Sequence, residues 1–434
     1  MRLREFALLW SAILSMRFAE QMVAVAVGWQ VYAIRRNPLD LGLIGLAEFL
    51  PLPILALPAG QLSDRASRRL VLACSLAMST VIVALLLVVT LHGATQLWPF
   101  LVLAAATGVA SAIGWPAYSS LTPEVVPPDL LPGAVALRSV AGQMAVVVGP
   151  ALGGVLFSIN SKIVYIVAVA LFLLALGAVL SLHTRHVATE PAPGFGELVA
   201  GVRFVLHTRM LLGAIGLDLF AVLFGGATAL LPVFARSILH TGPIGLGVLR
   251  SAPAVGALVA ALILARRPLR WPAGPTLIAV VAIFGVCMIV FGLSRTIWLS
   301  VAALAVSGFV DMISVNIRST TVALVTPDAL RGRVTAVEMV FISASNELGA
   351  FESGLVASLV GTVTAVVAGG IATVGLALSW MKLFPSLAHM GRLEDLRPEP
   401  IGQAARSPVA ATSTEDSPIP HESEQSAATG VSNP

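Results

Sequence analysis

Residues 60–72 read GQLSDRASRRLVL, with one aspartate and three arginines between two long apolar runs. The whole chain is 57% hydrophobic and only 11% charged, and its mean hydropathy is +0.93. A soluble domain has about twice that share of charged residues. The charged stretch is therefore interpreted as a short polar hairpin that joins two membrane-spanning helices.

The apolar runs are long enough to predict an all-α membrane protein. A helix needs roughly 20 apolar residues to cross a bilayer, whereas barrel strands would be short and alternating. Runs such as VIVALLLVVTL are continuously apolar, which excludes a barrel. The sequence predicts twelve transmembrane helices, at 6–34, 39–62, 69–92, 97–122, 132–157, 161–182, 210–236, 242–265, 273–294, 296–323, 332–357 and 360–385.

Most arginines outside these helices fall on the same side of the membrane as the N-terminus, including those of the hairpin. Short basic loops stay in the cytoplasm. We therefore expect a multi-pass protein of the plasma (inner) membrane with both termini cytoplasmic. The excess of basic over acidic residues is then explained by the arginines that anchor the loops in the cytoplasm, and we expect no nucleic-acid partner.

The chain also repeats itself at an offset of 200 residues. GLIGL at 42–46 returns as GPIGL at 242–246, and Gly149 and Gly154 recur as Gly349 and Gly354. Parallel repeats of this length predict two pseudo-symmetric six-helix bundles. The expected organisation is a bundle at 1–182, a cytoplasmic linker at 183–209, a second bundle at 210–386 and a disordered cytoplasmic tail at 387–434.

The hairpin resembles the loop between helices 2 and 3 of the major facilitator superfamily, which follows roughly G-x-L-a-D-r-x-G-r-r-x-x-l. The sequence departs from this pattern at Ser63 and Ser67, where the family has Ala and Gly. The matching residues are Gly60, Leu62, Asp64, Arg65, Arg68, Arg69 and Leu72. The resemblance covers residues 1 to about 386 and implies the superfamily's transporter fold.

The hairpin is predicted to act as a gate. Asp64 would cap the helix that follows, where its carboxylate faces the positive end of the helix dipole. The arginines would bind Glu338 when the cytoplasmic side is shut. The alternative is that they only anchor the topology.

The predicted fifth transmembrane helix carries AGQMAVVVGPALGGVL at 141–156. Gly149, Pro150, Gly153 and Gly154 predict a bent, closely packed helix. The stretch resembles the pattern g-x-x-x-G-P-x-x-G-G of the superfamily's drug and metabolite antiporters, which implies export. A close-packed crossing with no further role is the alternative.

Ionisable residues inside the predicted helices are the candidates for substrate and proton binding, because each is costly in lipid. A carboxylate there can bind a proton on one side and release it on the other. The proton-coupling candidates are Glu20, Asp218, Asp311 and Glu347, and Arg17, Arg138 and Arg250 are candidates for attracting an anionic substrate. Static pairing is the alternative: Arg17 and Glu20 are one turn apart, and Asp311 and Arg318 share a face. Asp218, Arg138, Arg250 and Glu48 would pair between helices.

The stretches RFAEQMVAVAVGWQVYAI at 17–34 and YSSLTPEVVPPDLLPGAVALRSVAGQMAVVVGPALGG at 118–154 are similar to the enterobactin-exporter-like branch of the superfamily. That resemblance implies efflux of a small siderophore-like or drug-like molecule, driven by a proton gradient through alternating access, by a single chain. A proton-coupled importer of a sugar or organic acid, or a non-transporting receptor, remains open. We expect no enzyme and no cofactor or metal site, because the sequence has no metal-ligand spacing, G-x-S-x-G or P-loop.

Overall fold

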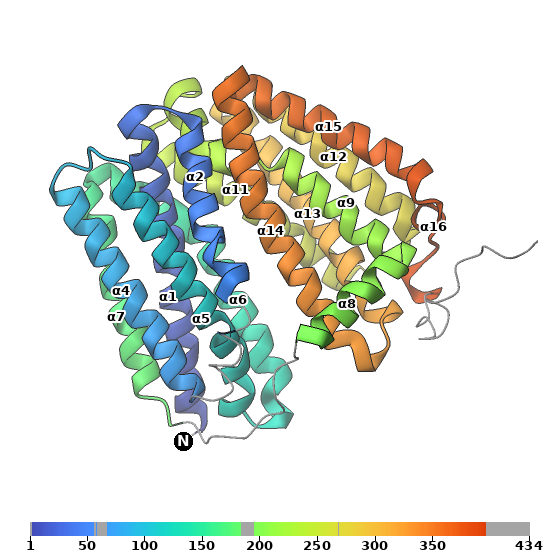
Figure 1. Ribbon diagram of the computed structural model, residues 1–434, viewed down its shortest axis with the longest axis horizontal. Coiled ribbons are helices and arrows are strands. Elements are labelled where there is room, and N and C mark those ends of the chain that lie inside the picture. The colour runs from blue at the N-terminus through green and yellow to red at the C-terminus, as the bar shows by residue number, and fades with distance from the viewer. Residues whose placement is uncertain (1, 56–57, 59–66, 184–194, 268, 396–434) are drawn as a thin grey trace, which may run out of the picture.

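The computed structural model describes residues 2–55, 58, 67–183, 195–267 and 269–395. All regular elements within these ranges are helices (Figure 1). Continuous apolar runs favour this, because a helix bonds all its backbone groups internally and needs no partner strand in lipid. The long helices are α1 (Arg2–Arg35), α2 (Pro38–Phe49), α4 (Arg68–Leu91), α5 (Trp98–Val125), α6 (Leu131–Ile159), α7 (Ser161–Leu180), α8 (Phe195–His207), α9 (Arg209–Gly225), α11 (Gly242–Arg266), α12 (Ala273–Leu293), α13 (Ile297–Val325), α14 (Asp328–Val360) and α15 (Thr362–Leu383).

Eleven helical segments among the described residues are long and apolar enough to cross a membrane. They match eleven of the twelve predicted spans in position. The remaining one, at 332–357, lies in α14, which is long enough but interrupted by Glu338, Glu347 and Glu352. The span predicted at 39–62 is described as Pro38–Leu55.

The segment predicted to span 210–236 is a broken helix. α9 ends at Gly225, and Gly226 leaves the helical conformation with φ −74° and ψ 77°. The chain continues as short turns η2 (Ala227–Leu230), α10 (Leu231–Val233) and η3 (Phe234–Ile238). Proline at 232, which lacks a backbone N–H, helps to explain why no regular helix resumes at once.

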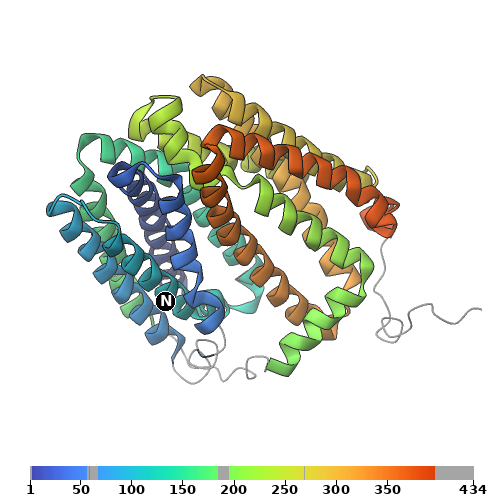
Figure 2. The ribbon, with the colours of Figure 1, turned by 45° about the horizontal axis from the view of Figure 1, so that its top comes forward.

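The helices lie in two groups, one from each half of the chain (Figures 1 and 2). In the first half (α1–α7), α1 packs against α6 and α7, and α4 packs against α5 and α7. In the second half (α8–α16), α12 packs against α13 and α15. Each half thus brings together helices that are distant in sequence.

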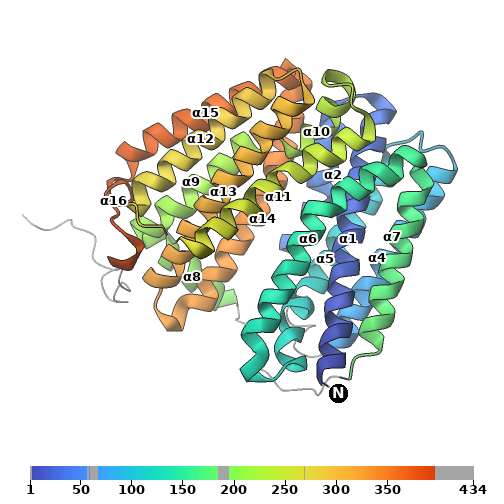
Figure 3. The same ribbon diagram turned by 180° about the vertical axis from the view of Figure 1, so that it is seen from behind.

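The two halves meet through two helix pairs, α6 with α11 and α2 with α14. They are closest at the end of the molecule opposite the N-terminus and diverge toward the end that holds it (Figure 3). A hydrogen bond between the hydroxyls of Tyr32 and Ser237, 2.9 Å apart, joins the halves at the closed end.

Two segments of the predicted organisation contain helices that the sequence did not indicate. The segment predicted as a linker contains α8, because Phe204 and Val205 on its inner side are buried in a cluster with α9 and α14. The predicted disordered tail is helical at its start, in α16 (Pro385–Ala388) and η4 (Leu393–Asp395). Leu387 and Met390 are buried against α12, which holds this part in place.

Candidate functional site

Most of the charged hairpin, including Gly60, Asp64 and Arg65, lies outside the described residues. The start of the following helix is described, and its cap is Ser67. The Ser67 hydroxyl accepts a hydrogen bond from the backbone N–H of Leu70 at 3.3 Å. The predicted interaction of Asp64 with the start of this helix lies outside the described residues and stays a prediction.

The two described arginines of the hairpin bind within the first half. Arg68 forms an ion pair with Glu124 of α5, with Nη1 and Oε1 2.8 Å apart. Arg69 donates a hydrogen bond to the backbone carbonyl of Leu180 at the end of α7. These contacts fix the start of α4 to both of its neighbours.

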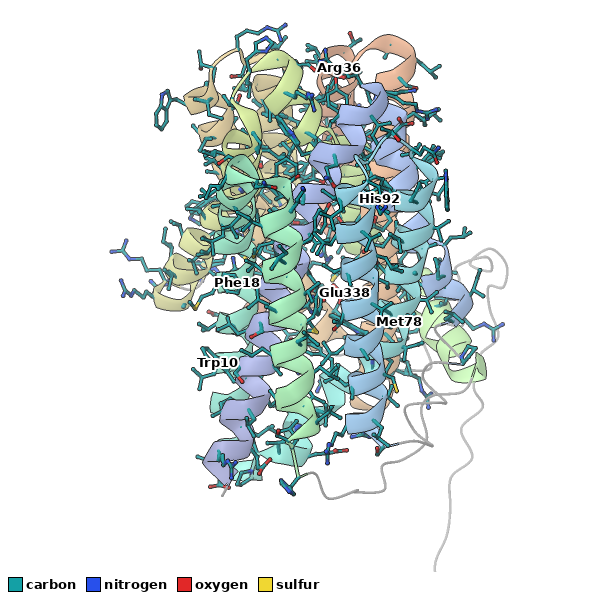
Figure 4. All side chains as sticks on the ribbon, turned by 90° about the vertical axis from the view of Figure 1, so that its left-hand side faces the viewer. Trp10, Phe18, Arg36, Met78, His92 and Glu338 are labelled. Carbon is teal, nitrogen blue, oxygen red and sulfur yellow. The ribbon has the colours of Figure 1, made fainter. Side chains whose placement is uncertain are left out.

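Glu338 belongs to α14 in the second half, and its side chain is buried. In Figure 4 its label lies between helices of the first half, which face the viewer. Its Oε1 accepts a hydrogen bond from Nε of Arg318 on α13 at 3.2 Å, and Arg318 also forms an ion pair with Asp218 on α9. All three side chains are buried. In this conformation, in which the halves diverge at the end that holds the N-terminus, Arg318 neutralises the Glu338 carboxylate from within its own half. The predicted pairing of Glu338 with the hairpin arginines belongs to the state in which that end is shut and stays a prediction.

The glycines of α6 allow α1 to approach closely. A Cβ at Gly149 would lie 2.7 Å from Cβ of Gln21, and one at Gly153 would lie 2.9 Å from Cα of Met22. Neither position has room for a larger residue. The predicted close packing is present, and it lies within the first half.

Gly154 of α6 faces the second half instead. A Cβ there would lie 2.5 Å from the carbonyl oxygen of Pro243 and 3.2 Å from Cα of Gly247, both on α11. The repeat reproduces this contact on the other side, where a Cβ at Gly354 of α14 would lie 3.0 Å from Cα of Gly42 on α2. Glycine therefore permits both contacts between the halves.

Arg17 and Glu20 form the ion pair that their spacing predicts, with Nη1 and Oε2 3.0 Å apart. Their side chains are 26% and 37% exposed, although they lie in the middle of α1. The Arg17 guanidinium lies 5.6 Å from the ring centre of Trp115 and 5.2 Å from that of Tyr118. Such contacts stabilise a cation by about 0.5–1 kcal/mol or more.

Arg138 joins the same cluster from α6. Its guanidinium lies 5.3 Å from the ring of Tyr118, and its Nη1 donates to the Thr122 hydroxyl at 3.3 Å. The aromatic partners on α5 were not among the predicted site residues. The sequence signal for these aromatic residues is their spacing. Trp115 and Tyr118 are three residues apart, so both rings lie on one side of α5 and can contact the same cation.

A second group of charges spans the two halves. Glu48 of α2, Arg250 of α11 and Glu347 of α14 interact electrostatically, and Glu48 also interacts with Glu20. Oε2 of Glu347 lies against α2, 3.0 Å from where a Cβ of Gly45 would be. Several carboxylates around one guanidinium can hold a proton or another cation between them.

The remaining candidates lie apart from this group. Asp218 pairs with Arg318, and Asp311 interacts electrostatically with both of them. The structure thus brings Arg17, Glu20 and Arg138 together on the first half, joins Arg250 and Glu347 across the halves, and places Asp218, Asp311 and Glu338 inside the second half. In the part of the chain described, no group of three His, Cys, Asp or Glu residues could hold a metal ion.

Long apolar helices in two groups, with charges buried between them, define a multi-pass membrane transporter. The chain belongs to the major facilitator superfamily, in the family described as transmembrane secretion effector, which matches residues 1–401.

Several curated relatives are transporters of the same superfamily or are named as exporters. The enterobactin exporter EntS of Citrobacter koseri is 27% identical over 300 residues, 68% of this chain and 70% of that protein. The multidrug efflux pump Tap of Mycolicibacterium fortuitum is 28% identical over 353 residues, 78% and 85% of the two chains. YfiS of Bacillus subtilis is 26% identical, and the alignment covers 54% of this chain and 57% of that relative. This chain therefore spans little more than half the length of YfiS.

Solved transporters share the fold. The nucleoside transporter NupG aligns with a TM-score of 0.63 at 16% identity, over 88% of this chain and 99% of that one. A bacterial homologue of the lysosomal transporter Spinster, in an inward-facing and unoccupied conformation, aligns with a TM-score of 0.67 at 15% identity, over 89% and 96%. The family match and the curated relatives identify the protein as a membrane transporter and not an enzyme.

Proposed function

We propose that this protein exports a small molecule across the plasma (inner) membrane by alternating access, in exchange for protons. The observation that carries this proposal is the contact between the halves. Paired glycines bring α6 to α11 and α2 to α14 at one end, while the helices diverge at the other (Figure 3). Such an arrangement can rock about a site near the middle of the membrane.

The proposed topology has twelve transmembrane helices in two six-helix bundles, at 1–182 and 210–386, with α14 as one of the twelve. The packing of α14 between α2 and α9 supports this, because its carboxylates Glu338 and Glu347 then face protein rather than lipid. Residues 183–209, including α8, connect the bundles.

The distribution of arginines supports a cytoplasmic N-terminus. The end at which the halves diverge then faces the cytoplasm, and the glycine contacts close the outer side. On closing the cytoplasmic side, the hairpin with Asp64 and Arg65 would come near the second half and act as the gate.

Export is supported by the names of the relatives, which include an exporter, an efflux pump and a Na⁺, Li⁺, K⁺/H⁺ antiporter. The proposed substrate is siderophore-like or drug-like, and the proposed energy source is the proton gradient, with no bound cofactor. The substrate and the bilayer are the proposed partners, without nucleic acid, and the proposed working unit is a single chain.

The proposed binding region lies between α1, α5, α6, α11 and α14. Glu20 and Glu347 are the preferred proton-binding residues, because both belong to groups of charges on helices that face the other half. Asp218 and Asp311 are second choices, because Arg318 already interacts with both. Arg17, Arg138 and Arg250 would attract anionic groups of a substrate.

The test uses purified protein in liposomes with a pH-sensitive dye inside. A pH gradient is imposed, and siderophores, cationic drugs, sugars and organic acids are added in turn. Proton flux that depends on a siderophore or drug, and is absent from protein-free liposomes, is the expected result. Flux with sugars or organic acids alone would contradict the proposed substrate class, and transport without proton flux would contradict the coupling ion.

A further inference from the structure

A small cavity lies in the second half, near the end where the halves meet. Its volume is about 170 Å³, and its walls come from α9, η2, α14 and α15. The wall is mostly apolar and includes Phe224, Leu230, Val356, Ala368 and Ala372. A cavity of roughly 150 Å³ with apolar walls accepts one benzene ring, so this one has room for a ligand of that size.

One charged side chain lies in the wall, the carboxylate of Glu352. Within the described residues, Glu352 forms no ion pair. The neighbouring Ser353 hydroxyl donates to the carbonyl of Gly226 at 3.1 Å. Glu352 is partly buried, and Ser353 also interacts with its carboxylate. A negative charge at an otherwise apolar wall attracts positive ligands, so the pocket favours a ligand with a positive group.

The pocket lies near an exposed apolar side of α14, which would face lipid in the proposed topology. Leu348, Leu355 and Leu359 are spaced by one or two helical turns from Glu352, on the same side of α14, and they are 40%, 37% and 75% exposed. Glu352 is eight residues before the end of α14 at Val360, which is about 12 Å along the helix axis. In that topology, the carboxylate would be accessible from the bilayer without passage between the two halves.

We propose that this pocket binds a ligand that carries an ammonium group on a small apolar body. The ammonium binds Glu352 through a charge-assisted hydrogen bond, and the apolar part fills the space between α9, α14 and α15. The site is separate from the charges on the facing helices and does not depend on the proposed export. A free aromatic amine dissolved in the membrane has this chemistry and is the proposed occupant. The ethanolamine headgroup of a lipid shares only the ammonium group, and it is tested as a competitor.

The test uses the full-length protein in nanodiscs of phosphatidylglycerol, which has no ammonium group. Binding of 4-fluorobenzylamine is followed by ¹⁹F NMR, with empty nanodiscs as background and 4-fluorobenzyl alcohol as the neutral ligand. We expect saturable binding of the amine that the alcohol does not match. Glu352→Gln should weaken it about tenfold or more, because a hydrogen bond between charged groups is lost.

Two further variants separate binding from folding. Ala372→Leu keeps the carboxylate but fills the cavity, so it should also weaken binding, whereas Glu394→Gln changes an exposed carboxylate elsewhere and should not. Equal binding to wild type and Glu352→Gln, or equal binding of the alcohol, would overturn the proposal. Phosphatidylethanolamine added to the nanodiscs tests this competitor: displacement of the amine assigns the site to the lipid headgroup, and lack of displacement assigns it to free amines.

Discussion

Arg318 is the residue whose loss we expect to harm the fold most. It is 4% exposed and binds both Asp218 and Glu338. Arg318→Met would leave two carboxylates buried without a cation, which costs about 3–5 kcal/mol. The expected result is a markedly lower melting temperature of the detergent-solubilised protein, measured by fluorescence-detected size exclusion after heating.

Two further variants serve as comparisons for this prediction. Arg318→Lys keeps the charge but not the planar fork that reaches both acids, so we expect an intermediate loss. Arg266→Met removes an exposed arginine at the end of α11 and should leave the melting temperature nearly unchanged. Similar melting of Arg318→Met and wild type would show that the network contributes little.

We expect a change at Glu20 to remove the coupling of transport to protons without preventing substrate binding. Glu20→Gln keeps an acceptor for Arg17 but cannot release a proton. Proton flux driven by substrate should fall at least about tenfold, while exchange of labelled for unlabelled substrate without a gradient continues. Asp129→Asn, an exposed carboxylate in a turn, is the control, and an unchanged flux in Glu20→Gln would remove Glu20 from the coupling candidates.

At the scale of elements, the contact between α6 and α11 depends on Gly154. A leucine there would meet the backbone of Pro243 and Gly247, which cannot yield as a flexible side chain would. We expect Gly154→Leu to keep the halves from closing on the outer side and to lower transport about tenfold or more, measured as initial rates in proteoliposomes. Gly177→Leu on α7, where a Cβ meets nothing within 4 Å, should transport normally; equal rates of the two variants would contradict the role of Gly154.

The helices could be predicted from the sequence because a membrane allows few alternatives to a long apolar helix. The exceptions follow from local chemistry. Gly226 breaks the segment after α9, which was predicted as one helix. α14 was predicted as a helix, although its charged residues lower its hydropathy. α8 was missed because its apolar residues bury a narrow side against α14 rather than crossing the membrane.

Partners of single charges were harder to predict. The pair of Arg17 with Glu20 follows from one helical turn, whereas Arg318 on α13 binds one acid on the next helix and another on α9, which is distant in sequence. Periodicity indicates which side of a helix a residue occupies but not which helix lies opposite. For this reason neither the contact of Glu338 with Arg318 nor the position of Trp115 and Tyr118 beside Arg17 follows from the sequence.

At the scale of the whole molecule, alternating access requires the two halves to separate at their closed end in each cycle. Tyr32 and Ser237 belong to opposite halves and form a hydrogen bond of 2.9 Å there. Cysteines at both positions, in a Cys74→Ser background that removes the exposed native thiol, can be joined by a short bifunctional thiol reagent. Because the link holds the outer side shut, we expect it to stop transport almost completely.

The matched control places cysteines at Trp10 and Leu137, which are joined by a 3.0 Å hydrogen bond within the first half. Linking them ties α1 to α6 but leaves the halves free to move, so transport should continue. A cleavable reagent adds a second check, because reduction should restore transport in the Tyr32–Ser237 variant. Full activity of that linked variant would mean that substrate crosses without opening of this end, which a rocking motion of two rigid halves does not permit.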